Sequence, residues 1–563
     1  MIKKLFLWSV ILMTGFAFYS CDDVIDNPAT GKQDPSNPNA TWTYEVGIKF
    51  AEFNSWYADV DGESVDAWKA PSTVYVYNKS REFLGELNAL EEFDYENFNF
   101  NSYYKFSGTL KGAIGEELFI TTLKDFDYYS KQDGTLKSIV ENSVLEVGRV
   151  PIIITNTSTG KIGTQNVKLE SKINAIRARI YDNLYFNSET DRAFTISGDS
   201  LAAENGSFTV NFAENIKPNE YFFFAFASLA QGYATYYLDI DSENGYKSYT
   251  VFSGTYKGNT GVNGTYRFYF NSYVRELDLT KYFAFRKSLE QGADENWGTW
   301  ANVQTYEDNE AIVTQSGKDA LPIEIDINGN VTLKDINVTR TMYASSGYKG
   351  TSTITLEGEN VVNSEWGSGF CSWGNITFKG NGSIAFSGYE NGIQISDGYS
   401  SYADEEGNEI KVINGITIDE GTTIKAFAPK NEYGDYNSGV VVYGRDSDID
   451  WVYVPEYDEN WNWIGYHYEQ VTLNLYDKDH NTSLIVNGTL EAEGGNQGIY
   501  SQLGIVKIGE TGSVKAISRK AWQKILFSTD DGEEAKLEDL VADKTKFNDT
   551  ISEDNTTRII TKK

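Results

Sequence analysis

The segment 446–468 brings aromatic rings and acidic groups together in close succession. Sugar rings present C–H faces that stack on flat aromatic rings, while Asp, Glu and Asn oxygens accept hydrogen bonds from hydroxyl groups. Trp461-Asn462-Trp463 lies between acidic residues and Gly465, a pattern that is typical of a protruding hairpin. We predict a carbohydrate platform made of Trp451, Tyr453, Tyr457, Trp461, Trp463 and Tyr466. The alternative is that these rings pack on the neighbouring scaffold as a small apolar cluster.

The same segment opens with three alternating carboxylates, Asp446, Asp448 and Asp450. In an extended strand they share one face, where they repel one another unless a cation joins them. Calcium prefers several oxygen ligands, so we predict calcium here as the only cofactor. The alternative is a solvated acidic edge, because no complete calcium loop accompanies these residues. A second arrangement of the same kind comprises Asp477, Asp479 and Asn481.

Catalytic signatures are weaker than binding signatures in this chain. A polysaccharide lyase needs a basic residue facing an acidic calcium cluster, and no motif singles out such a base among Arg340, Lys349, Lys425 and Arg445. Paired carboxylates for glycoside hydrolysis cannot be identified among 81 acidic residues. Only two histidines, His467 and His480, are present, which leaves little for zinc chemistry or a Ser-His-Asp relay. Binding is therefore favoured over catalysis.

The C-terminal half repeats one unit: a short alternating strand, a Gly or Asn corner, and a second short strand. The second strands centre on Ile336, Val361, Ile384, Ile424, Leu490 and Val514, at intervals in the low twenties with two longer gaps. This period is typical of a parallel β-helix, in which each turn stacks its apolar residues on the turn before it. We predict a right-handed parallel β-helix over residues 307–527, with the last four of these residues aligned one above another. Residues 528–563 are expected to be a cap or tail.

This half also resembles a known family. Phe370-Cys371-Ser372-Trp373-Gly374, the run from Ile376 to Ile384, and Asn391-Gly392-Ile393 are similar to the calcium- and polysaccharide-binding β-helix domains first seen in cellulolytic clostridia. Thr353 to Asn360 matches the preceding turn of that pattern, and the resemblance covers roughly 321–517. It implies a carbohydrate-binding module rather than an enzyme.

Residues 41–306 alternate with the period of strands and are punctuated by turns, which predicts two β-sandwiches, at 41–190 and 191–306. The stretch 167–180 also suits a helix, but its neighbours favour an extended strand with a bulge. The Val-Tyr-Val-Tyr strand at 74–77, the segment 149–152 and the basic strand 168–180 resemble fimbrillin-type lipoproteins of Bacteroidetes, most closely the anchor subunits. That resemblance implies transthyretin-like sandwiches. An unrelated pair of sandwiches is the alternative.

The N-terminus predicts the compartment. Lys3 and Lys4 precede an apolar run from Leu5 to Phe18, and small Ser20 precedes Cys21, which together are typical of a signal peptide over residues 1–20. The segment resembles a lipoprotein signal with a relaxed lipobox, which implies lipidation of Cys21 and two lipid chains that suffice for stable anchoring. Residues 21–40 are expected to be a flexible tether. The alternative is an ordinary secretory signal with Cys21 incidental.

The formal charge of −33 is unfavourable for nucleic acids and for anionic lipid heads, so contact with the membrane is expected through the lipid anchor alone. We therefore predict an all-β lipoprotein of the outer membrane, exposed at the cell surface, that binds polysaccharide as an adhesin or glycan-capture protein. One alternative is a calcium-dependent polysaccharide lyase or hydrolase of β-helix fold. Another is a fimbrial anchor or tip subunit whose partners are other fimbrial subunits.

Overall fold

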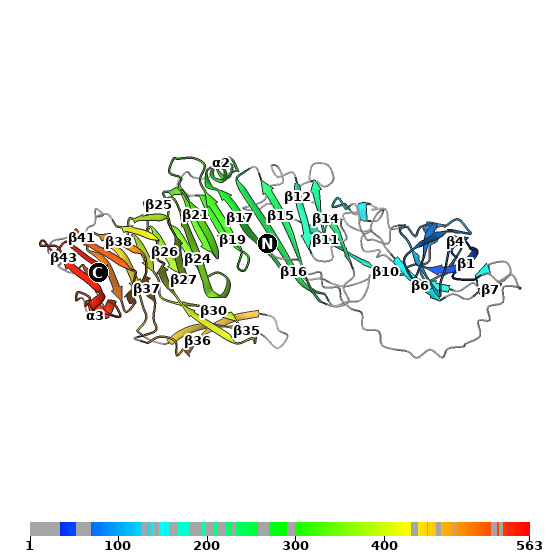
Figure 1. Ribbon diagram of the computed structural model, residues 1–563. Helices are drawn as coiled ribbons and strands as arrows, with labels where there is room; N and C mark the ends of the chain where they lie inside the picture. Colours follow the sequence, from blue (N-terminus) through cyan, green and yellow to red (C-terminus); the bar gives the residue numbers. More distant parts are fainter. Residues whose placement is uncertain are drawn as a thin grey trace. The chain divides into compact units, whose positions relative to one another are not determined.

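The chain is all-β and divides into two compact units, which are described separately (Figure 1). The computed structural model describes residues 34–51, 69–124, 132–135, 137–139, 146–151, 154–156, 161–162, 166–179, 193–198, 206–211, 221–227, 232–242, 244–256, 269–289, 299–428, 437–446, 449–457, 463–477, 479–519, 526–528 and 533–563. Unit 1 comprises Met1–Tyr129, Val140–Asn174 and Asn259–Asn263, and unit 2 comprises Ser130–Ile139, Ala175–Gly258 and Gly264–Lys563. No helix among the described residues is both long and apolar enough to cross a membrane. The all-β prediction is confirmed.

Unit 1 is built on one sheet with the order β10-β6-β5-β2-β3-β4-β1-β8-β7, and β9 also pairs with β1. Its strands are β1 (Thr41–Lys49), β2 (Thr73–Asn78), β3 (Phe83–Ala89), β4 (Tyr104–Lys111), β5 (Glu117–Thr121), β6 (Glu146–Pro151), β7 (Ile154–Asn156), β8 (Lys161–Ile162), β9 (Asn166–Lys168) and β10 (Glu170–Ser171). Alternation along β1 buries Trp42, Tyr44, Val46 and Ile48. The predicted extended conformation of 167–179 is confirmed by β9, β10 and β11 (Ile173–Arg179).

Unit 2 begins with antiparallel strands in the order β13-β12-β15-β16-β17. They are β12 (Ala193–Gly198), β13 (Ser207–Asn211), β15 (Gly232–Ser242), β16 (Tyr246–Tyr256) and β17 (Tyr269–Asp278), while β14 (Tyr221–Ala227) pairs with β11. The helix α2 (Leu279–Leu289) follows β17 and buries Leu279, Tyr282 and Phe285 against this sheet. β17 then pairs in parallel with β19 (Glu310–Thr314), so one sheet continues into the C-terminal half. The boundaries proposed from the sequence stay predictions.

The C-terminal half contains three sheets of parallel strands, and from residue 330 onward the chain visits them in a fixed order. Sheet 1 continues from β19 through β21 (Asn330–Lys334), β24 (Thr351–Glu357), β27 (Asn375–Gly380), β32 (Gly415–Ile418), β37 (Ser483–Val486) and β40 (Ile505–Ile508). Sheet 2 contains β18 (Thr299–Gln304), β20 (Ile323–Asn328), β23 (Met342–Ser345), β26 (Phe370–Trp373), β29 (Ile393–Ile395), β34 (Ser438–Tyr443), β39 (Gln497–Gln502) and β42 (Phe527–Ser528). Sheet 3 contains β22 (Asn337–Val338), β25 (Glu359–Ser364), β28 (Ser383–Gly388), β33 (Thr423–Phe427), β38 (Thr489–Gly494) and β41 (Ser513–Ser518). We call residues 299–528 the three-sheet stack.

Apolar residues of successive turns lie in register and form continuous columns inside the three-sheet stack. In sheet 3, Ile384 pairs with Ile424, Ile424 with Leu490, and Leu490 with Val514, so the predicted alignment of these four residues is confirmed. In sheet 2 the column comprises Ala301, Ile325, Met342, Phe370, Ile393, Val440, Ile499 and Phe527. All of them are buried in one shared core.

Val361, expected from the sequence to be a strand centre, does not belong to the sheet 3 column. Asn360, not Val361, pairs with Ile384, and Val361 is 39% exposed. The Asn360 side chain is buried and bonds three backbone groups: its Oδ1 accepts the Ile336 N–H, and its Nδ2 donates to the carbonyls of Glu357 and Ser383. A buried amide is tolerated at this corner because its hydrogen bonds are satisfied, and the sequence pattern alone favoured the neighbouring valine.

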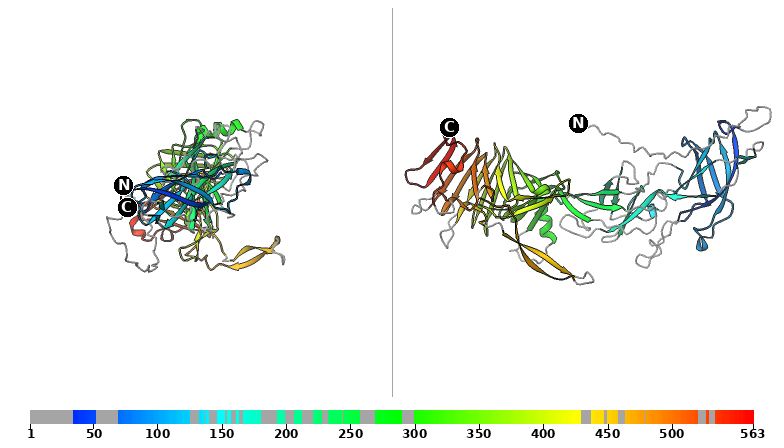
Figure 2. Two further views of the ribbon diagram at one scale, coloured as in Figure 1. Left: turned by 90° about the vertical axis from the view of Figure 1, so that its right-hand side faces the viewer. Right: turned by 90° about the horizontal axis from the view of Figure 1, so that it is seen from below.

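Two hairpins interrupt the stack where the sequence repeat has its longer gaps. β30 (Tyr399–Ala403) pairs antiparallel with β31 (Glu409–Ile413), and β35 (Ile449–Tyr457) pairs antiparallel with β36 (Trp463–Thr472). The β35–β36 hairpin projects from the three-sheet stack, as Figure 2 shows. The predicted protruding hairpin is confirmed.

The C-terminal segment closes sheet 3 with reversed strand direction. β44 (Thr557–Lys562) pairs antiparallel with β41, and β43 (Phe547–Ile551) pairs with β44. The buried Arg558 guanidinium ties this segment together by donating to Asp549, to Glu534 and to the Ala535 carbonyl. Antiparallel pairing ends the parallel repeat at this point.

A glycine stands directly before four members of the sheet 2 column, at Gly369, Gly392, Gly439 and Gly498. At Gly392 an added Cβ would lie 2.5 Å from the Phe427 nitrogen and 2.6 Å from the Gly439 oxygen, both backbone atoms. The chain turns from sheet 3 into sheet 2 so tightly here that a side chain has no room.

Gly392→Ala should therefore destabilise the three-sheet stack by about 2 kcal/mol, since backbone atoms cannot yield cheaply to the extra methyl group. Gly495→Ala is the matched control, because this glycine lies at an equivalent corner and its Cβ would meet nothing closer than 3.9 Å. Urea unfolding monitored by circular dichroism measures both variants. Equal stability of the two variants would contradict the steric explanation.

A buried carboxyl in unit 1 gives a second prediction. Burial raises the pKa of Glu146 to about 8. A hydrogen bond from the Ala51 N–H to Oε2, at 3.0 Å, lowers this pKa but has the smaller effect. The carboxyl is thus protonated in the folded chain at neutral pH and ionised in the unfolded chain. Unit 1 should lose up to about 1.4 kcal/mol of stability per pH unit between the unfolded pKa and 8, because the native state holds the extra proton.

Glu146→Gln should abolish this slope. Hydrogen exchange of peptides from β1 and β6, corrected for intrinsic rates and measured between pH 5 and 8, gives the opening free energy. Glu170→Gln is the control, because this side chain is 63% exposed on the adjacent strand β10. If the wild type and the Glu146→Gln variant show the same pH dependence, the assignment of a proton to Glu146 is wrong.

Candidate functional site

The predicted carbohydrate platform lies on the β35–β36 hairpin. In the backbone register Tyr453 pairs with Tyr468, Pro455 with Tyr466, and Tyr457 with Trp463, while Trp451 pairs with Gln470. Tyr466 and Tyr468 are 46% and 57% exposed, and their rings meet edge to face at 5.9 Å. Trp461 and the side chains of Trp451, Tyr453, Tyr457 and Trp463 lie outside the described residues, so this platform stays a prediction.

The hairpin also carries a histidine between two carboxylates. His467 Nδ1 lies 2.7 Å from Glu456 and Nε2 lies 2.9 Å from Glu469. Hydrogen bonds to Glu469 and then Glu456 raise the pKa of His467 above its ordinary value. The contact with Glu456 links β36 to β35, which gives this exposed histidine a role in holding the hairpin together.

The predicted calcium ligands are only partly described. Asp446 is exposed, Asp448 lies outside the described residues, and for Asp450 only the backbone, paired with Val471, is described. In the part of the chain that the structure describes, no three His, Cys, Asp or Glu side chains are grouped to hold a metal ion. Calcium stays a prediction.

The second calcium candidate has a structural use. The Asp477 carboxylate accepts the backbone N–H groups of Asp479 and His480, at 2.7 and 2.8 Å. The bond from Asp479 is the main cause of a lowered pKa of Asp477. Asn481 bonds the Arg445 backbone through both ends of its amide, at 3.0 and 2.8 Å. These side chains therefore shape a turn and join it to the strand end at Arg445.

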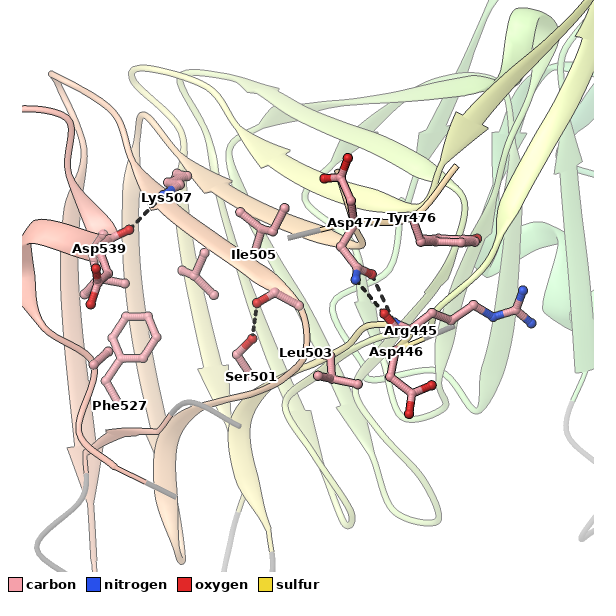
Figure 3. A pocket seen from close by; sticks show the side chains of 15 residues that line it. Arg445, Asp446, Tyr476, Asp477, Ser501, Leu503, Ile505, Lys507, Phe527 and Asp539 are labelled. Atoms are coloured by element: carbon pink, nitrogen blue, oxygen red, sulfur yellow. Dashed lines mark hydrogen bonds between the residues drawn. The ribbon is translucent and has the colours of Figure 1, made fainter. Parts of the chain in front are cut away.

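A pocket of about 530 Å³ lies between this turn and the C-terminal segment (Figure 3). Its polar groups are largely engaged in its own walls: Ser501 Oγ donates to the Gly504 carbonyl at 2.6 Å, and Lys507 Nζ donates to the Asp539 carbonyl at 2.8 Å. The Arg445 guanidinium lies against the Tyr476 ring and pairs with Asp397 at 2.8 Å. Hydrophobic residues such as Phe527 line the remainder. This pocket is mainly a packing feature of the stack's end.

A more distinctive arrangement lies on the outward face of sheet 2. Trp300 and Tyr343 are parallel to within 3°, with ring centroids 6.1 Å apart, and Tyr343 and Trp373 are parallel to within 19° at 5.0 Å. Trp300 and Trp373 nevertheless remain 51% and 53% exposed. We call Trp300, Tyr343 and Trp373 the ring stack. It presents two indole rings to solvent on either side of a tyrosine.

Trp300 and Tyr343 come together across β20, the strand that carries two carboxyl groups. Asn302 of β18 pairs with Asp326 of β20, which pairs with Tyr343 of β23, so β20 separates the strands of Trp300 and Tyr343. Two strand spacings amount to roughly 10 Å, yet the rings are 6.1 Å apart, so they tilt toward each other above β20.

These carboxyl groups belong to Glu324 and Asp326 of β20, both half-buried. Desolvation raises the pKa of each above its ordinary value. The charge of Arg340 opposes this effect at Glu324, and the charge of Glu324 helps raise the pKa of Tyr343, after burial. The site thus combines flat rings with acceptors for hydrogen bonds.

The sequence interpretation did not single out the ring stack. Trp300 was assigned to the second sandwich, and Trp373 contributed only to a family resemblance. The alternation Thr-Trp-Ala-Asn-Val-Gln in 299–304 could have indicated that Trp300 faces outward. The meeting of three rings depends on the register of sheet 2, and that register comes from the folded chain.

Comparisons with known proteins give only faint likenesses. No protein-family model matches the chain, and no curated protein matches it. Among solved structures, a Bacteroides thetaiotaomicron protein named as polysaccharide-binding is 11% identical, covering 36% of this chain and 76% of its own, with a TM-score of 0.18. A fimbrial assembly protein of Parabacteroides distasonis is 11% identical, covering 41% and 85%, with a TM-score of 0.17. A Bacteroides ovatus protein named as an adhesin is 10% identical, covering 36% and 73%, with a TM-score of 0.17. Likenesses of this size assign neither fold nor activity.

Cys371 allows the geometry of the outward face to be checked chemically. It pairs with Tyr343 and Gln394 in neighbouring strands, is 8% exposed, and burial raises the pKa of its thiol to about 11. In a folded Cys21→Ser chain, iodoacetamide at pH 8 should modify Cys371 at least a hundredfold more slowly than in the same chain unfolded in urea. The reagent cannot reach the buried sulfur, and only a small fraction of the thiol is ionised at this pH. Mass spectrometry follows the reaction. Equal rates in the two states would contradict the packing of this face.

Proposed function

We propose that this protein binds polysaccharide through the ring stack and does not cleave it. The observation that carries the proposal is a pair of half-exposed tryptophans flanking Tyr343 above half-buried carboxyls. The C–H faces of a sugar can stack on exposed indole surfaces, which removes apolar area of both from water. Glu324 and Asp326 can accept hydrogen bonds from the sugar hydroxyls.

The scaffold supports this proposal because it holds the rings on strands. We propose that the three-sheet stack is the right-handed parallel β-helix expected from the repeat. Ring positions are then set by backbone ladders and by the buried columns beneath them. Binding groups on regular elements lose less conformational freedom when they engage a ligand than groups on loops do.

Binding is preferred to catalysis because of how the two carboxyls are placed. Glu324 and Asp326 are two residues apart on one strand and face the same way. Hydrolysis of a glycosidic bond uses two carboxyl groups that flank the bond from different sides. Side-by-side acceptors suit recognition of a sugar better than attack on it.

The cellular setting of this function is proposed from the sequence. Cys21 lies outside the described residues, and the signal-like segment before it supports a lipid anchor. We propose that the protein is held at the outer membrane by this anchor and presents the ring stack to polysaccharide outside the cell.

The test compares three tryptophan variants. Trp300→Ala and Trp373→Ala should each weaken polysaccharide binding about tenfold, equivalent to about 1.4 kcal/mol. Trp366→Ala is the matched control, because Trp366 is 73% exposed but does not belong to the ring stack. A glycan array identifies ligands, and isothermal titration measures affinities for variants whose circular dichroism matches the wild type.

Unchanged affinity in both ring-stack variants would refute this site. If variants of Tyr466 and Tyr468 then abolished binding instead, the β35–β36 hairpin would be the platform.

A further inference from the structure

The three sheets differ sharply in the charge of their strands. Sheet 1 carries Lys334, Lys379 and Lys507, and sheet 3 carries Lys425 and Lys515. The eight strands of sheet 2, all of them within the described residues, contain neither lysine nor arginine. The face that bears the ring stack is thus the one without cationic strand residues.

Amides and tyrosines occupy most of the outward positions that continue from the ring stack. They are exposed or half-buried and comprise Asn302, Gln304, Asn328, Gln394, Tyr443, Tyr500 and Gln502. Such side chains both donate and accept hydrogen bonds without net charge, which matches the hydroxyl groups of an uncharged sugar. We call these residues, together with the ring stack, the sheet 2 track.

The register aligns the residues of the sheet 2 track along the stack, with two buried positions between them, Cys371 at 8% and Val441 at 3% exposure. Tyr343 pairs with Cys371, Cys371 with Gln394, and Gln394 with Val441, which pairs in turn with Tyr500. Tyr443 pairs with Gln502 at the adjacent position. From β18 to β39 there are six strand spacings, which amount to about 29 Å at roughly 4.8 Å each. That length accommodates about six sugar units laid end to end.

The Arg340 cation acts on this face at Glu324, and three carboxylates act on it as well. Glu324 and Asp326 lie on β20, and the charge of Glu390 contributes to raised pKa values of both Tyr343 and Tyr443, after burial. The whole chain carries a formal charge of −33. A polyanion laid along the face would meet repulsion from these carboxylates, whereas an uncharged chain would not.

We infer that the ligand is an uncharged polysaccharide lying lengthwise along the sheet 2 track, so that its interior sugar units are recognised over several strands. This inference rests on the proposed function and adds two claims to it: exclusion of uronate and sulfate polymers, and dependence on chain length. Neither claim follows from the ring stack alone, which would hold one or two sugars.

Matched polymers test the charge claim with the intact protein. Affinity electrophoresis compares hydroxyethylcellulose with carboxymethylcellulose, dextran with dextran sulfate, and galactan with polygalacturonate, with galactomannan and xyloglucan as further neutral probes. At least one neutral polymer should retard the protein, and no anionic polymer should do so at 150 mM salt. Retardation by the anionic member of a pair equal to or greater than that by its neutral partner would overturn the inference.

Oligosaccharides of the best neutral polymer test the length claim by isothermal titration. Affinity should rise at least tenfold between two and six sugar units. Tyr443→Ala and Gln502→Ala, several strands away from the rings, should weaken binding of the hexamer about fivefold and leave the dimer unaffected. Lys379→Ala on sheet 1 is the control and should change neither.

The outcomes separate the inference from the function beneath it. If affinity is already maximal at two or three units and Tyr443→Ala has no effect, while Trp373→Ala still weakens binding, the lengthwise track is wrong and the proposed function stands. If no polysaccharide binds, or if neither Trp300→Ala nor Trp373→Ala changes affinity, the proposed function itself fails and the inference falls with it.

Discussion

The in-register stacking of apolar side chains inside the three-sheet stack is the interaction on which the other features depend. Columns such as Ile384, Ile424, Leu490 and Val514 bury one hydrophobic residue directly above another in successive turns. Each such side chain contributes roughly 2 kcal/mol when it is removed from water. A shift of one residue in any strand would expose a whole row of these side chains, so the register is strongly determined.

The buried columns also fix the positions of the side chains on the outward face. Because strand residues alternate between the two sides of a sheet, fixing Ala301 and Val303 inside also fixes Trp300 outside, with no contact of its own required. Adjacent parallel strands lie less than 5 Å apart, so rings on neighbouring strands, such as Tyr343 and Trp373, come within stacking distance. The ring stack is thus a by-product of buried columns, and the same columns keep its exposed indoles in place. Glu324 and Asp326 lie on the strand between Trp300 and Tyr343, and burial raises the pKa of both carboxyls.

Prediction from the sequence was most successful where one simple period dominated. Regular spacing of Ile384, Ile424, Leu490 and Val514 led to the correct alignment, and the turn-rich aromatic insertion led to a correct hairpin. It failed at Val361, because a buried asparagine replaced the expected apolar residue and used its amide to satisfy backbone groups. Hydrophobic patterning cannot detect such a substitution, which depends on where neighbouring carbonyls and N–H groups lie after folding.

By itself, the sequence determined the all-β character, the repeat and its inward columns, and the hairpin that breaks it, because alternation and turn residues act over short stretches of chain. Only the tertiary structure decided which outward residues meet. Trp300, Tyr343 and Trp373 are spread over more than seventy positions of the chain, and their contact depends on how the intervening corners and loops set the register of sheet 2. The same holds for the tilt of the rings toward each other across β20 and for the absence of cationic residues from the strands of sheet 2, because both depend on which strands become neighbours. The loops between these strands vary widely in length, so spacing along the chain does not reveal which strands will pair.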